Sequence, residues 1–252
     1  MNKLPAWRLA RHAYLDVLAN LQGLVQVGVL WLALGWALMM LGRSLALFSA
    51  AADIVVAVGA AAIAVTWHRH ILHDEPLTVR FAPVDARVVR YFVFTVLLAF
   101  LVGVIPLTLL MLMTGGATDP AAAGEGPGMG LLLVPVLMIA CIYAAMRLQL
   151  IFPATAIGDQ ALNLARSWAV TAGNGWRLTL GFFLATLPVA LLVLGVALFL
   201  GWAADATGSI ALSALADLAT VANAWIQAPL IASFLSYAYI FFRQQGTAVA
   251  TQ

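Results

Sequence analysis

Three histidines lie between His68 and Glu75, the densest group of side chains in the chain that could do metal or proton chemistry. On a helix His70, His73 and Asp74 share one face, at spacings that metal sites use. Membrane di-iron enzymes need several such clusters, however, and the one remaining histidine is His12. Two interpretations therefore stay open: the solvated, partly cationic end of a helix, or a regulatory site that binds a metal ion or senses pH. The sequence predicts no cofactor.

A second group of polar side chains forms a stripe within an apolar stretch near the C-terminus. At 100° per residue its four members fall within about 120° of arc: Asp217, Thr220, Asn223 and Gln227. Such residues avoid lipid and face the interior of a bundle or a water-filled cavity. The stripe either forms hydrogen bonds between helices or lines a path for a ligand or ion.

A third group lies between residues 159 and 177, where charged, polar and aromatic side chains occur together: Asp159, Arg166, Ser167, Trp168, Asn174 and Arg177. A serine hydrolase would need a histidine base near the serine, and this segment has none. The group is either a solvated polar face or a binding site for lipid headgroups or a partner protein. In the second case Arg166 and Arg177 would meet phosphate.

The composition of the chain determines the environment in which these groups must work. Of its 252 residues 64% are apolar and 9% are charged, and the mean hydropathy is +1.03. Soluble domains are about half apolar and a quarter charged, so this chain belongs in lipid. We therefore expect a single all-α integral membrane domain over residues 1–252. Six stretches are long enough to cross the bilayer: about 22–42, 49–67, 91–113, 130–150, 178–201 and 218–241.

The positive charges predict the orientation of these spans. With the N-terminus in the cytoplasm, eleven of the twelve basic residues fall at the inner face, and Arg43 alone falls outside. This is the distribution expected of loops that stay in the cytoplasm. The inner-face residues are Lys3, Arg8, Arg11, Arg69, Arg80, Arg87, Arg90, Arg147, Arg166, Arg177 and Arg243. Both termini are therefore expected in the cytoplasm of a bacterium, with the chain in the inner membrane. The orientation accounts for the basic residues, so the high pI is not taken as a sign of nucleic-acid binding.

Two cytoplasmic segments show amphipathic helical patterns and are predicted to lie in the membrane interface. The first spans residues 6–20. The second spans 159–174, with Gly158 and Asp159 read as its start and residues 173–175 as its stop. In the second helix Ser167 and Asn174 belong to the polar side, and Trp168 lies on the apolar side.

The stretch from Arg147 to Trp176 also carries a family resemblance. Pro153 and Asp159 precede Ser167-Trp168, which is followed by Asn174 and Trp176. This pattern resembles a large group of uncharacterised six-helix bacterial membrane proteins, which includes the membrane domain attached to some glycerophosphodiester phosphodiesterases. The resemblance implies the six-helix fold. The phosphodiesterase activity is not carried over, because the chain contains no soluble phosphodiesterase barrel.

The sequence favours a non-enzymatic protein that binds lipid or a membrane-protein partner, in an accessory or organising role. The partner could also be a second copy of the chain. The alternative is a transporter of small molecules or lipids that uses the polar stripe from Asp217 to Gln227 as its path.

Overall fold

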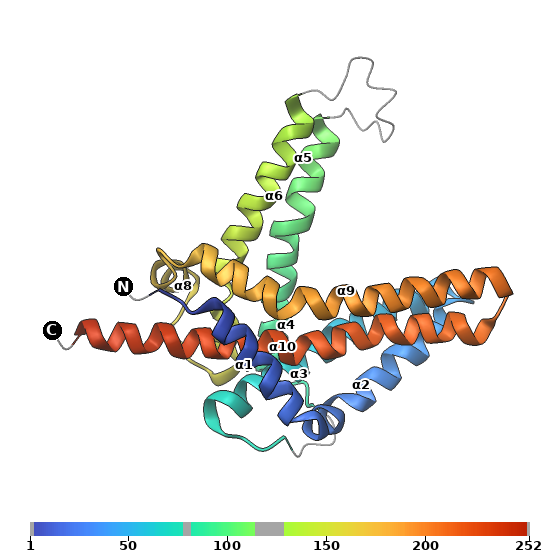
Figure 1. Cartoon of the computed structure of the whole chain (residues 1–252), viewed down its shortest axis with the longest axis horizontal. Coiled ribbons are helices and arrows are strands. Elements are labelled where there is room, and N and C mark those ends of the chain that lie inside the picture. Colours follow the sequence, from blue (N-terminus) through green and yellow to red (C-terminus); the bar gives the residue numbers. More distant parts are fainter. Residues whose placement is uncertain (1–2, 78–81, 114–128, 251–252) are drawn as a thin grey trace.

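The computed structural model describes residues 3–77, 82–113 and 129–250, and all secondary structure in this part of the chain is helical. The elements are α1 (Ala6–Ala19), α2 (Leu21–Gly42), α3 (Ala46–His73), α4 (Ala86–Ala99), the π-helix η1 (Phe100–Val104), α5 (Ile105–Met113), α6 (Met129–Leu148), α7 (Ile151–Ile157), α8 (Leu164–Val170), α9 (Gly175–Thr207) and α10 (Ile210–Ala250) (Figure 1).

Six helices are long and apolar enough to cross a membrane, which confirms the all-α class and the number of candidate spans. Several run further than the sequence predicted. Helix α3 continues through the histidine segment to His73. Helix α10 extends over 41 residues, whereas the sequence predicted a helix over residues 218–241 only. These extensions carry polar side chains because they continue past the apolar stretch that hydropathy detects.

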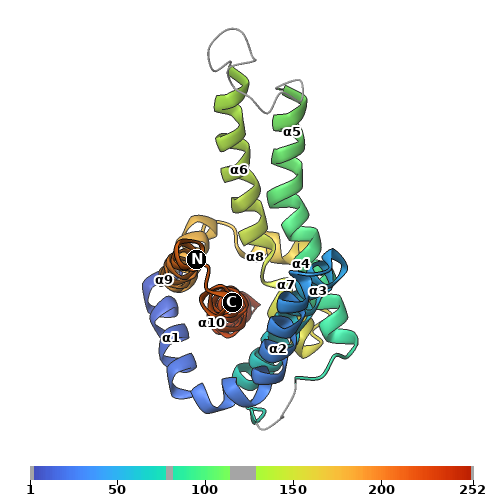
Figure 2. The same cartoon turned by 90° about the vertical axis from the view of Figure 1, so that its right-hand side faces the viewer.

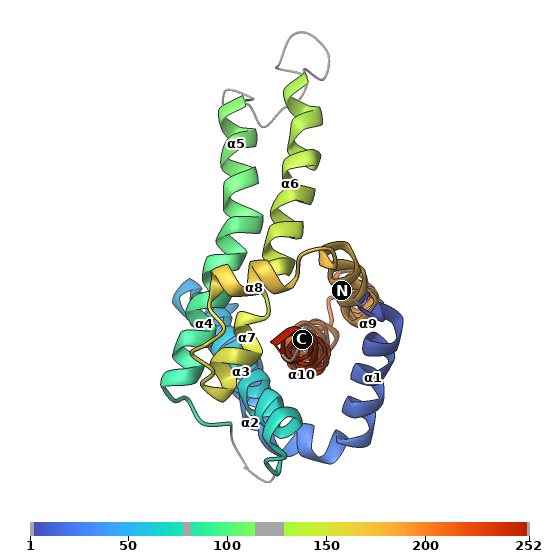
Figure 3. The ribbon, with the colours of Figure 1, turned by 90° about the vertical axis from the view of Figure 1, so that its left-hand side faces the viewer.

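Helix α10 occupies the centre of the molecule. Seen along its axis, α1 and α9 lie on one side of it and α2 and α3 on the other (Figures 2 and 3). Its middle and C-terminal parts contribute fully buried side chains such as Leu230, Phe234 and Leu235 to the main apolar core. The core is therefore built around one helix, and the other elements are placed by their contacts with it.

The hairpin of α5 and α6 points away from this group of helices and across their long axis in all three views (Figures 1, 2 and 3). Its apolar side chains, among them Leu107, Leu112 and Val136, are exposed. Spanning helices are tilted by about 20° on average from the bilayer normal. The six apolar helices therefore do not all run in one direction. To cross a flat bilayer six times, the hairpin would have to turn relative to the other four spans.

The π-helix between α4 and α5 has a local cause. Pro106 has no backbone N–H, and its ring would collide with the carbonyl of Val102 in a regular α-helix. In η1 the N–H of Ile105 instead reaches back five residues to the carbonyl of Phe100. The extra residue in this turn lets the helix continue past the proline.

Helix α2 approaches its neighbours through glycines. A Cβ atom added at Gly28 would lie 1.7 Å from Nε1 of Trp225 on α10, and one added at Gly35 would lie 2.8 Å from a methyl group of Val56 on α3. The absence of a side chain lets the helices come this close. The glycine face of α2 is therefore used for contacts within the chain.

We expect Gly28→Ala to lower the free energy of unfolding by about 1–3 kcal/mol, since the added methyl group overlaps a bulky indole in a packed region. Gly195→Ala in α9 is the matched control, because a Cβ there meets nothing within 4 Å. Alanine also favours a helix more than glycine does, so the control should be neutral or slightly stabilising. Unfolding by sodium dodecyl sulfate in mild detergent measures both, and equal losses would contradict the close α2–α10 contact.

Candidate functional site

The segment between α6 and α9 differs from the predicted helix over 159–174. Helix α7 ends at Gly158, whose φ of 75° is left-handed and suits glycine. Residue 158 is therefore a helix stop, although the sequence suggested a start. The following helix, α8, has seven residues, and Asn163 begins it by accepting a hydrogen bond from the Arg166 N–H. Residues 6–20, by contrast, are helical almost throughout as predicted, in α1.

The polar side of α8 faces the protein. Ser167 is fully buried, and its hydroxyl donates to the carbonyl of Arg147 at 2.7 Å. The Arg147 guanidinium contacts the C-terminal end of α8. Its Nε donates to Thr171 Oγ1 at 3.2 Å, and an Nη donates to the Trp168 carbonyl. Its Cζ lies 3.7 Å from the Trp168 ring centre. A cation over an aromatic face and at a helix C-terminus is favourable on both counts. Ser167 and Trp168 thus hold the end of α6.

Asn174 and Arg177 bind the N-terminal segment. Asn174 is 3% exposed, and its Oδ1 accepts a hydrogen bond from the Leu4 N–H at 2.8 Å. Arg177 donates to the Leu4 carbonyl at 3.2 Å. Both polar groups of a fully buried leucine backbone are therefore satisfied across 170 residues of sequence. Asn174 does not belong to the exposed polar face that the sequence predicted.

Asp159 and Arg166 complete the predicted cluster. Asp159 accepts hydrogen bonds from the Ala161 N–H through Oδ1 and from the Tyr239 hydroxyl of α10 through Oδ2. Arg166 is exposed and donates to the Ala161 carbonyl at 3.3 Å. Among the six predicted residues, Arg166 is thus an exposed charged side chain whose hydrogen bond to Ala161 stays within five residues of it in sequence.

The stripe on α10 does not act as one unit. Asp217 forms a salt bridge with Arg43, with Nη2 and Oδ2 2.6 Å apart. Arg43 is the one basic residue that the charge pattern placed at the outer face, so its charge is balanced where it occurs. Thr220 is exposed and donates to the carbonyl of Ala216, one turn earlier on the same helix. Neither Asp217 nor Thr220 lines the pocket described below.

In the second half of the stripe, Asn223 and Gln227 each have an oxygen atom without a hydrogen-bond partner. Gln227 donates through Nε2 to the Thr186 carbonyl of α9 at 2.9 Å, while its Oε1 is buried without a hydrogen-bond partner. The Oδ1 of Asn223 is likewise buried without a partner. Gln227 tethers α10 to α9 and is the one member of the stripe that borders the pocket described below.

The histidine segment does not assemble a metal site. Arg69 and Glu75 form a salt bridge at 2.6 Å, and His70 donates through Nδ1 to the Glu75 carbonyl at 2.7 Å. His73 and Asp74 are exposed at the end of α3, where Asp74 adopts a left-handed φ of 52°. Within the described residues no group of three or more histidine, cysteine, aspartate or glutamate side chains is placed to hold a metal ion.

A polar network that was not predicted from the sequence lies around Asp16 of α1. Oδ2 of Asp16 on α1 accepts from Trp67 Nε1 at 2.9 Å and from Ser233 Oγ at 2.6 Å. One turn away, His68 Nδ1 and Ser236 Oγ lie 2.7 Å apart. Trp67 is fully buried. The available signal was the pair of serines three residues apart on α10.

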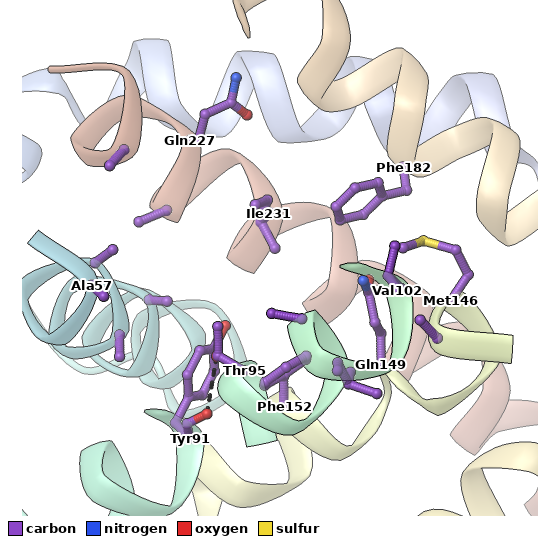
Figure 4. A pocket seen from close by; sticks show the side chains of 18 residues that line it. Ala57, Tyr91, Thr95, Val102, Met146, Gln149, Phe152, Phe182, Gln227 and Ile231 are labelled. Carbon is purple, nitrogen blue, oxygen red and sulfur yellow. Dashed lines mark hydrogen bonds between the residues drawn. The ribbon is translucent and has the colours of Figure 1, made fainter. Parts of the chain in front are cut away.

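A pocket of about 420 Å³ lies where the base of the α5–α6 hairpin meets α3 and α10 (Figure 4). Alanines of α3 and α10 form one wall. Side chains of α4, α6 and α7 form the other, where the Tyr91 and Phe152 rings meet at a tilt of 42° with their centroids 4.5 Å apart. None of the lining residues is charged. The pocket has the size and apolar character of small-molecule and cofactor sites.

Gln149 brings a polar group to this apolar pocket. It follows α6, is 9% exposed, and points among Val102, Met146 and Phe152 (Figure 4). Its Oε1 is buried without a hydrogen-bond partner. A glutamine two residues after Arg147 in an apolar stretch was visible in the sequence, but nothing there indicated that it would border a cavity.

Comparison with known proteins finds no matching family model, no matching curated protein and no matching solved structure. The resemblance carried by residues 147–176 therefore stays a prediction, and the function must be argued from the pocket and the charges around it.

Asn174→Ala should release the segment before α1, since it leaves the buried Leu4 N–H without its acceptor. Such a loss costs about 1–3 kcal/mol. Amide hydrogen exchange of the N-terminal peptide, read by mass spectrometry, should accelerate by about 5- to 100-fold. Asn174→Asp keeps an acceptor and should restore protection. Asn20→Ala, which removes a bond to the carbonyl of Asp16 at the end of α1, is the control and should leave residues 4–8 protected.

Proposed function

We propose that this chain is a non-enzymatic inner-membrane protein that binds a membrane lipid in the pocket between α3, α4, α6, α7 and α10. The observation that carries the proposal is the apolar, uncharged lining of that pocket within helices that are themselves apolar enough to span a membrane. A ligand that enters such a space must be mostly hydrocarbon, because a buried charge without a partner is strongly unfavourable.

The depth of the pocket also suits a lipid chain. Tyr91 and Gln149 lie close to Arg90 and Arg147, at the predicted inner ends of their helices. Ala57 lies ten residues before Trp67 on α3, about 15 Å along the helix axis. The pocket therefore extends from near the inner membrane surface toward the middle of the bilayer, as an acyl chain does.

Positive charge near this end supports an attraction to the membrane surface. Arg8 and Arg11 on α1 and Arg90 on α4 are exposed, and within the described residues none of them forms an ion pair. Basic residues at the cytoplasmic surface of a bilayer attract anionic headgroups. We propose that these arginines, together with Arg166, contact headgroups in the inner leaflet.

The charge pattern supports the orientation in which both termini face the cytoplasm of a bacterium. In this orientation α1 and α8 lie at the inner surface, where exposed Trp7 and Trp168 would reach the interfacial region. A membrane-protein partner or a second copy of the chain could bind the exposed apolar hairpin, which gives the protein an accessory or organising role.

Transport is the alternative function, and the contacts of the stripe favour it less. Asp217 and Thr220 bond to Arg43 and to their own helix, and only Gln227 borders the pocket. A continuous polar path would need all four side chains to face one cavity. Binding within the pocket requires only the surfaces already present.

Filling the pocket should abolish lipid retention. Ala57→Phe places a ring at an exposed position on the pocket wall of α3, and Ala50→Phe places the same ring two turns earlier at an exposed position outside the lining. After extraction into polymer nanodiscs and transfer to a mild detergent, native mass spectrometry should show one retained lipid on the parent protein and on Ala50→Phe. Ala57→Phe should lose it. Retention by Ala57→Phe, or no lipid on the parent protein, would refute the pocket as the binding site.

The orientation has a separate test. An alkaline phosphatase reporter, active only in the periplasm, should be inactive when fused after Gln252 and active when inserted at Gly124. The opposite pair of results would show that the predicted orientation is wrong. The sides of Gly124 and Gln252 are both predicted from the same distribution of basic residues.

A further inference from the structure

Gln149 distinguishes this pocket from a simple apolar groove. Its side chain is about nine-tenths buried, its Oε1 has no hydrogen-bond partner, and it borders the cavity at the end nearest the inner membrane surface. A buried acceptor without a partner costs free energy in the empty protein. A ligand that donates a hydrogen bond there would recover that cost, whereas a ligand without a donor would leave it in place.

The lining limits the charge of that donor. None of the lining residues is charged, so neither an ammonium group nor a phosphate would find a countercharge in the cavity. Arg147, the nearest cation in sequence, is held by the Trp168 ring and carbonyl and by Thr171. A neutral hydroxyl group fits these conditions, because it donates one hydrogen bond and carries no charge.

We propose that the pocket selects an uncharged, single-chain lipid whose head carries a hydroxyl group, with that hydroxyl donating to Oε1 of Gln149 and the chain lying along the alanines of α3 and α10. The inference depends on the proposed lipid-binding function and adds the class of ligand. Gln149 acts as the specificity-determining residue, and the apolar walls supply most of the affinity.

The test is a competition between two probes that share a chain and differ in one proton donor. 1-Tetradecanol donates and accepts a hydrogen bond, and its methyl ether accepts only. Equal concentrations are added to the delipidated protein in mild detergent, and native mass spectrometry compares the two adducts. One neutral hydrogen bond corresponds to about a fivefold preference for the alcohol. In Gln149→Leu, which is similar in size, the ratio should fall to about one while the ether still binds.

Gln227→Leu is the matched control. Its amide also borders the pocket, but Gln227 is tied to Thr186 on α9 and points toward that helix (Figure 4), so the preference for the alcohol should persist. Ether binding by Gln149→Leu shows that this variant is folded, and Gln149→Met replaces it if the leucine variant aggregates.

The outcomes separate the two proposals. Any of three results would overturn the assignment of Gln149: an alcohol-to-ether ratio of one on the parent protein, a fivefold ratio that persists in Gln149→Leu, or a preference lost in Gln227→Leu. Binding of both probes would still support a lipid pocket. Recovery of a phospholipid as the sole retained lipid would likewise overturn the ligand class and leave the lipid-binding function standing. Binding of neither probe, together with no lipid on the parent protein, would refute the lipid-binding function itself.

Discussion

Five polar side chains along α10 bond to five different neighbouring segments, and these bonds help to determine where the other helices lie. In chain order, Asp217 pairs with Arg43 after α2, Gln227 bonds to α9, and Ser233 bonds to Asp16 of α1. Ser236 then meets His68 of α3, and Tyr239 reaches Asp159 after α7. Within hydrocarbon, water cannot satisfy such groups, so each must find its partner inside the protein. Apolar packing alone would allow neighbouring helices to slide along α10. These bonds specify the position of each helix along the α10 axis.

The same constraint explains why Ser167 and Asn174 of the predicted cluster lie inside the protein. The helical pattern of residues 159–174 predicts a polar and an apolar side, but it does not indicate which side meets the protein. Ser167, Thr171 and Asn174 face inward, and the apolar Leu164 and Trp168 are exposed. At a membrane surface this orientation is favourable, because the lipid accepts the apolar side and the protein supplies partners for the polar side. The aqueous rule that polar residues face outward predicts the reverse.

The sequence allowed prediction of the features that depend on composition and local periodicity. The all-α class, the six candidate spans and the helix over residues 6–20 depend on runs of neighbouring residues, and the structure contains them. The partners of Asp16 could not be predicted, because a hydrogen bond between residues 51 or 217 positions apart leaves no local pattern. Short polar side chains such as Ser233 and Ser236 scarcely change the hydropathy of a helix, so they gave little indication of a network.

The pocket lies at the junction between the α5–α6 hairpin and the helices around α10. Its α3 and α10 wall belongs to the group of helices that polar contacts join to α10. Its opposite wall, from α4, η1 and α6, belongs to the base of the hairpin. Crossing the bilayer in alignment with the other spans would require the hairpin to turn at this junction, and Gln149 lies on the turn between α6 and α7. A ligand that contacts both walls must favour the hairpin position that shapes the pocket best, since binding shifts an equilibrium by its difference in affinity for the two states. If a lipid occupies the pocket as proposed, its binding and the position of the hairpin are linked.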